Sequence, residues 1–296
     1  MKEKPFSKYQ ILANAVMIIW TLAIILPFIL LFMSSITDEN TLVANGYSFF
    51  PKKFSLASYS YIIKSGGQIL KAYGVSIGVT VVGTLLNVLL SALMAYPLSV
   101  KNLPGRNVMM FFVFFTMLFN GGIVPSYIMW TGTFHIKDTI FAQLLPNFLL
   151  SAWNVMMIRT YFTTSIPDGL YEAAEIDGAS QFTIFWKIVL PLGKPILVTM
   201  GTFAGLAYWN DWTNGLYYIV KNTGLYNVQN LLNQMVQNIQ FLTQSSNSNV
   251  TAAASPIPAT GIQMAIAFVA ILPIMLIFPS FQKYYAKGIA LGAVKG

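Results

Sequence analysis

A single charged side chain lies inside the long apolar stretches of this sequence. Asp211 stands in the segment Trp209-Asn210-Asp211-Trp212, within residues 196–220. The carboxylate and the Asn210 amide can bind hydroxyl groups, and the two indole rings can stack on the apolar faces of sugar rings. We therefore predict that these four residues contact a substrate. Because the segment lies far along its apolar stretch, it also fits the belt of aromatic residues at a membrane surface.

A second candidate interrupts an apolar stretch with small residues. Asn120, Gly121 and Gly122 are followed by Pro125 within residues 107–130. Broken helices at membrane depth line cavities or act as hinges, whereas small residues also let neighbouring helices pack closely. We predict that Asn120, Gly121 and Gly122 lie along a substrate pathway, with close helix packing as the alternative.

The composition defines the class of protein in which these residues stand. Of the 296 residues, 56% are hydrophobic and 9% are charged, and the mean hydropathy is +0.64. Soluble domains carry about 25% charged residues, so an ordinary soluble enzyme and a disordered protein are both excluded. The sequence has no cysteine and one histidine, His135, which leaves little for nucleophilic catalysis or metal binding. We expect no catalytic residue, no metal site and no cofactor bound by this chain.

Six apolar stretches are long enough to cross a membrane as helices, because about 20 residues span the ~30 Å hydrocarbon core. Their ranges are 11–33, 72–98, 107–130, 139–158, 196–220 and 262–282. If both termini are cytoplasmic, eleven of the 17 lysine and arginine residues face inside, as the positive-inside rule requires. The sequence therefore predicts one all-α, polytopic membrane domain over residues 1–296. The net charge of +8 is explained by this orientation and not by nucleic acid.

The cytoplasmic segment 163–195 has the features of two short helices joined by a turn. Pro167 suits a helix start, and the acidic residues that follow lie near the end of the helix that attracts negative charge. Gly178 is the residue type that ends a helix in a left-handed turn, and Ser180 is a good N-cap for a second helix that Pro191 would stop. We predict an elbow that exposes a small, acidic, alanine-rich surface to another protein. A solvated loop with one capped helix is the alternative.

The same segment resembles the EAA loop of ABC importer permeases. The residue types and the spacing match at Glu172, Ala173, Ala174, Gly178, Ile188, Leu190 and Pro191. Three further segments, 120–125, 209–212 and 287–296, are similar to carbohydrate-uptake permeases of the MalG/LplC-like branch. The resemblance implies a type I ABC importer permease fold, in which the matching residues, together with Asp177, contact an ATPase.

The resemblance also implies which partners complete the transporter. A second, homologous permease would form a heterodimer with this chain and complete the pathway. An extracellular solute-binding protein would deliver a carbohydrate, which in this branch is an oligosaccharide. Two cytoplasmic ABC ATPases would use ATP and Mg, so the chain itself would be a non-catalytic subunit of the bacterial cell membrane. The C-terminal tail 283–296, through Lys295 and Gly296, would also contact the ATPases.

Two other functions fit part of the sequence. The solute of an ABC permease can also be a peptide or another non-sugar compound. A secondary transporter driven by a proton gradient is the rival from another class, but the six stretches lack the chain of ionisable residues that a proton relay needs. Transport that depends on a proton gradient instead of ATP would favour that rival.

Overall fold

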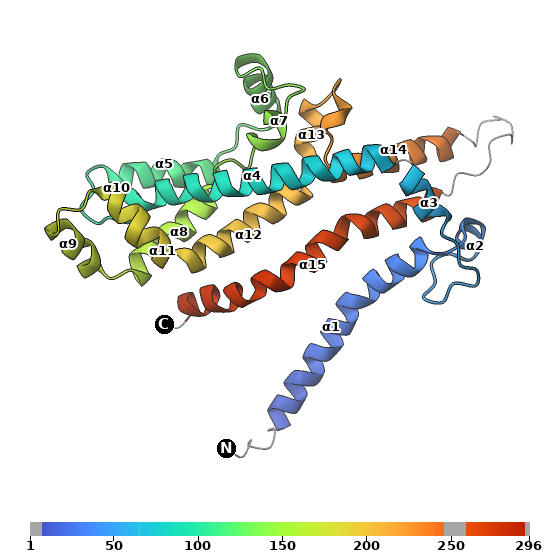
Figure 1. Ribbon diagram of the computed structural model, residues 1–296, viewed down its shortest axis with the longest axis horizontal. Helices are drawn as coiled ribbons and strands as arrows, with labels where there is room; N and C mark the ends of the chain where they lie inside the picture. The colour runs from blue at the N-terminus through green and yellow to red at the C-terminus, as the bar shows by residue number, and fades with distance from the viewer. Residues whose placement is uncertain (1–7, 65, 246–258, 294–296) are drawn as a thin grey trace. The chain divides into compact units, whose positions relative to one another are not determined.

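The part of the chain that the structure describes is mostly helical (Figure 1). The computed structural model describes residues 8–64, 66–245 and 259–293. The chain divides into two compact units: Met1–Ile69 with Leu232–Pro273, and Leu70–Leu231 with Ile274–Gly296. The long helices follow from the uninterrupted apolar runs of the sequence, because a backbone in hydrocarbon must satisfy its own hydrogen bonds.

The first unit contains α1, Lys8–Ser35; α2, Glu39–Asn45; α3, Ala57–Lys64; and parts of α14, Val228–Ser245, and α15, Ala259–Ala293. Both α1 and α15 hold a stretch that is long and apolar enough to cross a membrane. The two helices meet at Phe32 and Phe268, whose ring centroids lie 4.9 Å apart. The Glu39 carboxylate accepts hydrogen bonds from the backbone N–H groups of Thr260 and Gly261, at 2.9 and 2.8 Å. These are donors that a helix start leaves without a partner, so Glu39 fixes the beginning of α15 against α2.

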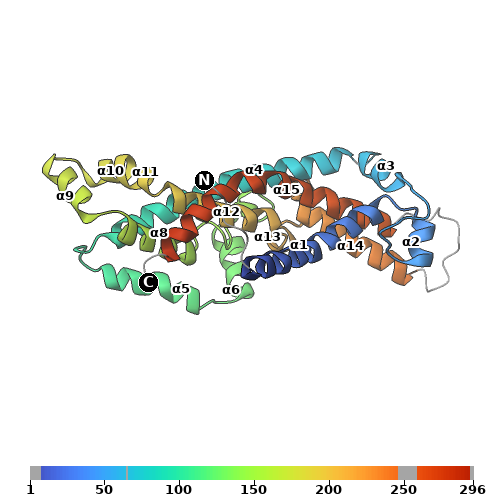
Figure 2. The ribbon, with the colours of Figure 1, turned by 90° about the horizontal axis from the view of Figure 1, so that it is seen from below.

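The second unit is organised around three long helices: α4, Gly66–Ser99; α8, Ala152–Ser165; and α12, Lys194–Asn210. Both views show α8 and α12 alongside α4 (Figures 1 and 2). Its shorter helices are α5, Arg106–Leu118; α6, Ile123–Ile128; α7, Phe141–Leu144; α9, Asp168–Ile176; α10, Gln181–Ile184; α11, Leu190–Leu192; and α13, Thr213–Tyr218. The core includes the buried side chains of Ala92, Leu98, Val155, Ile158, Phe162 and Met200. These apolar contacts position α9 to α11 at one end of the unit.

A polar contact joins the same helices inside the apolar core. The Asn154 side-chain amide on α8 donates to Asn87 Oδ1 on α4 at 2.7 Å, and Asn87 Nδ2 donates to the Phe148 carbonyl at 2.6 Å. Both asparagines are buried. Because a buried amide is costly to leave unpaired, this contact sets the register of α8 against α4.

Two bent helix pairs are each long and apolar enough to form one span, and the first of them coincides with a predicted span. The span over 107–130 is formed by α5 and by Ile123–Thr133, with an angle of 111° between them. At that bend Gly122 has a φ of +86°, which glycine adopts without strain, and its N–H donates to Asn120 Oδ1 at 2.8 Å. The other pair joins Gln181–Leu192, which belongs to the predicted cytoplasmic segment 163–195, to α12 at 79°. α12 ends at Asn210, so the predicted span 196–220 is not one continuous helix. By length and composition, the described residues contain three single helices able to cross a membrane, or up to five spans if each bent pair is one.

The stretch 139–158 differs from the predicted single helix. It contains α7, then an irregular segment, and then the first half of α8. Pro146 lacks a backbone donor, and Asn147 has a φ of +68°, which a helix does not allow. Apolar composition predicted a continuous helix here, but these two residues break it.

A glycine of α4 makes room for a large side chain of α12. A Cβ atom added at Gly83 would lie 2.5 Å from the ring of Tyr208. The Tyr208 ring cannot move freely, because it is buried and its hydroxyl donates to the Leu144 carbonyl at 2.9 Å. Gly83 therefore allows the closest approach of α4 to this tyrosine.

Candidate functional site

The predicted elbow is present as α9, a turn, and the helical segment that starts with α10. α9 begins directly after Pro167 and ends in a turn at Gly178, whose φ is +76°. The N–H of Ala179 donates to the Ala174 carbonyl at 2.9 Å, and the N–H of Gly178 donates to the Glu175 carbonyl at 3.0 Å. This pair of bonds is the usual way in which a left-handed glycine closes a helix.

The second half of the elbow departs from the prediction at Pro191. The Ser180 hydroxyl caps α10 by accepting from the Thr183 N–H at 3.2 Å, as expected. A wider π-helical turn, Phe185–Val189, follows, and the helix continues through Pro191 to Leu192. Pro191 is the second residue of α11 and therefore lies inside this continuous helical segment. The change of direction comes instead at Gly193, where a Cβ atom would lie 2.5 Å from the Phe162 ring.

The predicted coupling residues fall into two groups by exposure. Ala174 is buried, and Ile188 and Leu190 pack partly buried against the same core. The exposed members are Glu172, Ala173, Asp177, Gly178 and Pro191. The first group holds the elbow on the helix bundle, and the second forms an exposed surface with two carboxylates. Lys295 and Gly296, the predicted tail contacts, lie outside the described residues.

Apolar side chains add to the exposed surface of the elbow. Ile176, at the end of α9, is 86% exposed. Phe182 and Trp186 are also exposed, and their rings meet edge to face with centroids 5.9 Å apart. Apolar and aromatic side chains surrounded by polar groups are typical of protein–protein interfaces.

Long-range hydrogen bonds that sequence reasoning did not find anchor the elbow to α4. Tyr96 Oη donates to Gln181 Oε1 at 2.6 Å, and Gln181 Nε2 donates to Glu175 Oε1 at 2.9 Å. An ion pair of 2.5 Å joins Lys101, just after α4, to Asp168 at the start of α9. The partners are 67 and 85 residues apart, so no local pattern could reveal them. Together they connect both ends of α9 to the C-terminal end of α4.

The segment 209–212 divides between buried and exposed side chains. Trp209 and Asp211 are 7% and 6% exposed, whereas Asn210 and Trp212 are exposed. Asp211 Oδ1 accepts from the backbone N–H groups of Thr213 and Asn214, at 3.0 and 3.3 Å. Because these are the first donors of α13, the Asp211 carboxylate acts as the cap of that helix. The three residues 120–122 are exposed and lie in the bend between α5 and α6.

Buried amides hold the segment after Asp211 in place, and the sequence analysis did not single them out. We call Gln143, Asn214, Asn227 and Asn230 the amide cluster; all four side chains are buried. Asn227 Nδ2 donates to the Asp211 carbonyl at 2.6 Å, Gln143 Nε2 to Asn230 Oδ1 at 3.3 Å, and Asn214 Nδ2 to the Pro146 carbonyl at 3.1 Å. The amide cluster thus ties the end of α12 to the irregular segment that breaks 139–158.

An exposed carboxylate fixes the neighbouring loop. Asp138 Oδ1 accepts from three consecutive backbone N–H groups, of Val220, Lys221 and Asn222, at 2.7, 2.8 and 3.2 Å. These donors, with the N–H of Lys221 contributing most, hold the pKa of the Asp138 carboxyl below its ordinary value. Asp138 therefore stays ionised and keeps residues 220–222 in one conformation.

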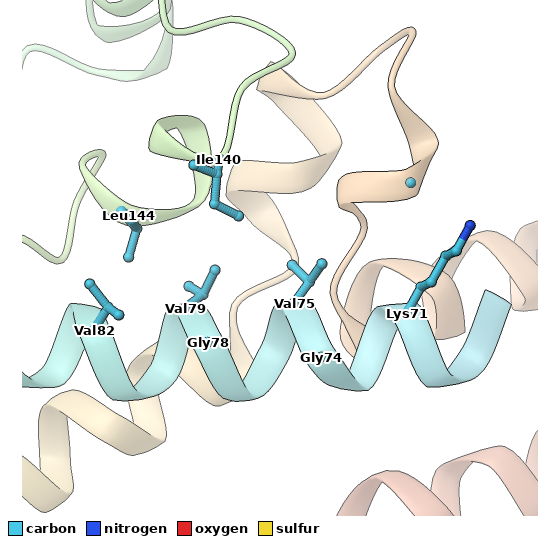
Figure 3. Close-up of a pocket in the computed structure, with 9 residues that line it drawn as sticks. Lys71, Gly74, Val75, Gly78, Val79, Val82, Ile140 and Leu144 are labelled. Carbon is cyan, nitrogen blue, oxygen red and sulfur yellow. The ribbon is translucent and has the colours of Figure 1, made fainter. Parts of the chain in front are cut away.

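An apolar groove of about 590 Å³ runs along α4 (Figure 3). Its walls are Lys71, Gly74, Val75, Gly78, Val79 and Val82 of α4, with Ile140, Leu144 and Gly224. Figure 3 shows the three valines on the side of α4 that faces Ile140 and Leu144. Its valine, leucine and isoleucine side chains offer no hydrogen bonds to hydroxyl groups, and none of the predicted pathway residues lines the groove.

The helical unit and its elbow are those of a transport permease, and the comparisons with known proteins agree. The family described as "Binding-protein-dependent transport system inner membrane component" matches residues 72–291. The chain belongs to this family of inner-membrane transport subunits.

Two proteins of Bacillus subtilis (strain 168) are similar over nearly their whole length. Protein LplC is 37% identical over 92% of this chain and 90% of its own. The polygalacturonan/rhamnogalacturonan transport system permease protein YtcP is 36% identical over 97% of this chain and 98% of its own. A crystal structure of a bacterial ABC transporter that imports the acidic polysaccharide alginate contains a chain with a TM-score of 0.78 and 25% identity, matched over 96% of this chain and 100% of that one.

Proposed function

We propose that this chain is the permease subunit of an ATP-driven importer of carbohydrates, with an oligosaccharide as the substrate. The observation that carries the proposal is the elbow of α9 and α10, with its glycine turn and exposed Glu172 and Ala173. The relatives support the substrate class, because YtcP is named for transport of polygalacturonan and rhamnogalacturonan. A second permease would form the other half of the pathway, and a binding protein would deliver the sugar.

In the proposed mechanism the elbow is the contact through which ATP hydrolysis on two partner ATPases reaches the membrane helices. Closure of the ATPases would move α9. Two connections would carry that movement to α4: the hydrogen bonds that link Glu175 to Gln181 and Gln181 to Tyr96, and the ion pair of Lys101 with Asp168. The pathway would then alternate between an inward-facing and an outward-facing state. The chain itself would make and break no covalent bond.

The test of this function is purification and reconstitution. A tag on the N-terminus leaves the C-terminus, a further proposed ATPase contact, free. We expect a second permease and an ATPase to copurify with this chain in mild detergent. The complex is then reconstituted in vesicles whose lumen holds the ATPases, with binding protein and oligosaccharide outside. We expect these vesicles to accumulate sugar only when ATP is supplied in the lumen. Uptake driven by a proton gradient without ATP would overturn the proposal in favour of a secondary transporter. A peptide taken up in place of sugar would overturn the substrate class alone.

Reversing the charge of Glu172 is expected to uncouple transport without affecting membrane insertion. The side chain is exposed, so Glu172→Lys changes the partner contact and not the core. A lysine facing a basic groove on the ATPase should cost about 2–5 kcal/mol of interface energy, a loss of more than tenfold in affinity. The measurement is ATP-dependent uptake together with recovery of the ATPase on the tagged chain. Glu172→Gln keeps the shape of the side chain and should lose less uptake. Equal uptake by the Lys variant and the parent would show that Glu172 takes no part in the coupling contact.

We further propose that the exposed members of the segment 209–212, Asn210 and Trp212, contact the sugar, and that Asp211 positions them by capping α13. Asp211→Asn retains an oxygen that can accept from the N–H groups of Thr213 and Asn214, whereas Asp211→Ala does not. We expect the Asn variant to keep most of the uptake. The Ala variant should lower the free energy of unfolding by about 1 kcal/mol, as the loss of other helix caps does. If both variants raise the sugar concentration needed for half-maximal uptake equally, with unchanged stability, the carboxylate itself binds the sugar.

Six membrane crossings with both termini in the cytoplasm remain our proposed topology. It rests on the six apolar stretches of the sequence and on the distribution of lysine and arginine, whereas the described residues supply up to five spans by length and composition. Since the chain has no cysteine, single cysteines at Lys101 and Lys221 can be labelled from one side at a time with a membrane-impermeant maleimide. Labelling of both from the same side would overturn the topology.

A further inference from the structure

The segment between α2 and α3 exposes an unusual number of large apolar side chains for a loop. We call residues 46–56 the aromatic loop. Phe50 is 88% exposed, Phe54 66% and Leu56 68%, and Tyr47 is exposed as well. A loop that faces only water would be expected to carry polar side chains, and exposed apolar patches mark a protein partner or a membrane.

Backbone contacts hold the aromatic loop against the residues that follow α1. The N–H of Ser55 donates to the Ile36 carbonyl at 2.8 Å, and the N–H of Asp38 donates to the Lys53 carbonyl at 3.0 Å. An antiparallel bridge pairs Thr37 with Phe54. Since α1 ends at Ser35, the paired residues are one to three positions beyond the helix, within about 10 Å of its end along the chain.

The length of α1 places that end at the membrane surface. Its apolar stretch, Tyr9–Ser35, has 27 residues, which corresponds to about 40 Å of helix at 1.5 Å per residue. The hydrocarbon core is about 30 Å thick and the bilayer with its headgroups about 40–45 Å. A helix that crosses this bilayer therefore ends among the headgroups, and the loop paired to its end must lie at the same level.

The residue types of the aromatic loop match the chemistry of that layer. Phenylalanine, leucine and tyrosine partition into the boundary between headgroups and acyl chains, and lysine extends its ammonium group to lipid phosphates. Lys52 and Lys53 stand between Phe50 and Phe54 and are exposed. Lys53 also pairs with Asp38 at 3.3 Å, which keeps its stem beside the end of α1. The sequence of apolar, basic and apolar residues fits a lipid surface better than an apolar groove of a protein.

We propose that the aromatic loop is a lipid-binding anchor, which inserts Phe50, Phe54 and Leu56 into the headgroup boundary beside the end of α1 and directs its lysines to phosphates. The anchor would fix the depth of α1 in the bilayer. It would also limit the movement of α1 along the membrane normal while the pathway changes conformation. The proposal depends on the chain being a membrane protein and does not depend on which solute is transported.

Depth measurements with spin labels test the anchor in the assembled transporter. Because the chain has no cysteine, one cysteine at a time can be introduced in place of Phe50, Phe54 or Leu56 and labelled with a nitroxide. Asn45→Cys is the matched control, since Asn45 is exposed and polar and ends α2 directly before the loop. The transporter is reconstituted in phosphatidylcholine and phosphatidylglycerol vesicles, and the accessibility of each label to oxygen and to a water-soluble nickel chelate is measured.

We expect the ratio of oxygen to nickel accessibility to be several-fold higher at Phe54 and Leu56, and at Phe50, than at Asn45. A ratio equal to that of Asn45 at all three sites would show that the loop lies in water and would overturn the proposal. Low accessibility to both reagents would place the loop against a protein partner and would overturn it too. Loss of accessibility only after the binding protein is added would identify that protein, and not lipid, as the occupant.

Discussion

Replacing Gly178 by valine is expected to lower ATP-driven uptake strongly while the chain still inserts into the membrane. Gly178 has a φ of +76°, and a Cβ atom there would meet nothing within 4 Å, so the whole cost comes from the backbone. A left-handed conformation costs an ordinary residue about 1–2 kcal/mol, and a β-branched residue is the least suited to it. That cost lowers the ratio of the formed to the unformed turn by about 5- to 30-fold. The measurement is uptake into vesicles at fixed protein content.

The matched control for this prediction is Gly178→Asn, because asparagine visits the left-handed region more readily than other residues. We expect the Asn variant to keep most of the uptake and to recover the ATPase on a tagged chain, and the Val variant to lose both. If valine were tolerated as well as asparagine, the left-handed turn would not matter for coupling. If both variants failed equally, the glycine would be needed for close approach of a partner instead of for its φ.

Replacing Gly83 by alanine is expected to be among the most destabilising single-methyl changes in the second unit. The new Cβ atom would lie 2.5 Å from the Tyr208 ring, so the ring or α4 must shift. Overpacking of this kind costs about 1–3 kcal/mol, and loss of the Tyr208 hydrogen bond to Leu144 adds about 1 kcal/mol. The measurement is the thermal unfolding midpoint of the purified chain in detergent and, for the whole transporter, the yield of assembled complex.

Gly74 on the same helix provides the control for Gly83. A Cβ atom at Gly74 meets nothing within 4 Å, and alanine is favoured over glycine in a helix by about 1 kcal/mol. Gly74→Ala should therefore leave the unfolding midpoint unchanged or raise it. Equal destabilisation by both substitutions would mean that helix flexibility, and not contact with Tyr208, explains the role of these glycines.

The helices and the elbow could be predicted because their causes are local in the sequence. Uninterrupted apolar runs produce α1, α4 and α15, since hydrocarbon leaves the backbone no other way to satisfy its hydrogen bonds. Pro167, Gly178 and Ser180 mark the elbow because each acts on its own backbone or on a neighbour within a few residues. The break in 139–158 was visible in principle at Pro146, but the apolar composition around it outweighed that signal in our prediction.

The anchoring of both candidate sites could not be predicted, because it depends on contacts between distant residues. Tyr96 and Gln181 meet only after α4 and α10 have packed. Asp211 was predicted from its isolation in an apolar stretch to contact a substrate. The bonds of its Oδ1 to the N–H groups of Thr213 and Asn214 were not predicted, because the helix that follows sets them. The sequence does not distinguish Gln143 and Asn227 from ordinary polar residues, because only the fold buries their side chains together.

The amide cluster has a consequence for how the transporter responds to the membrane potential. Moving one elementary charge across the membrane field changes the free energy by about 2.3 kcal/mol per 100 mV. The opening of a gate built from ion pairs would therefore depend on the membrane potential. The bonds of Gln143, Asn214, Asn227 and Asn230 involve neutral amides and backbone carbonyls. They can break and re-form without moving a charge of their own. Among the groups that these amides hold in place, the Asp211 carboxylate, which accepts from the Asn214 N–H, is therefore the one on which the membrane field would act.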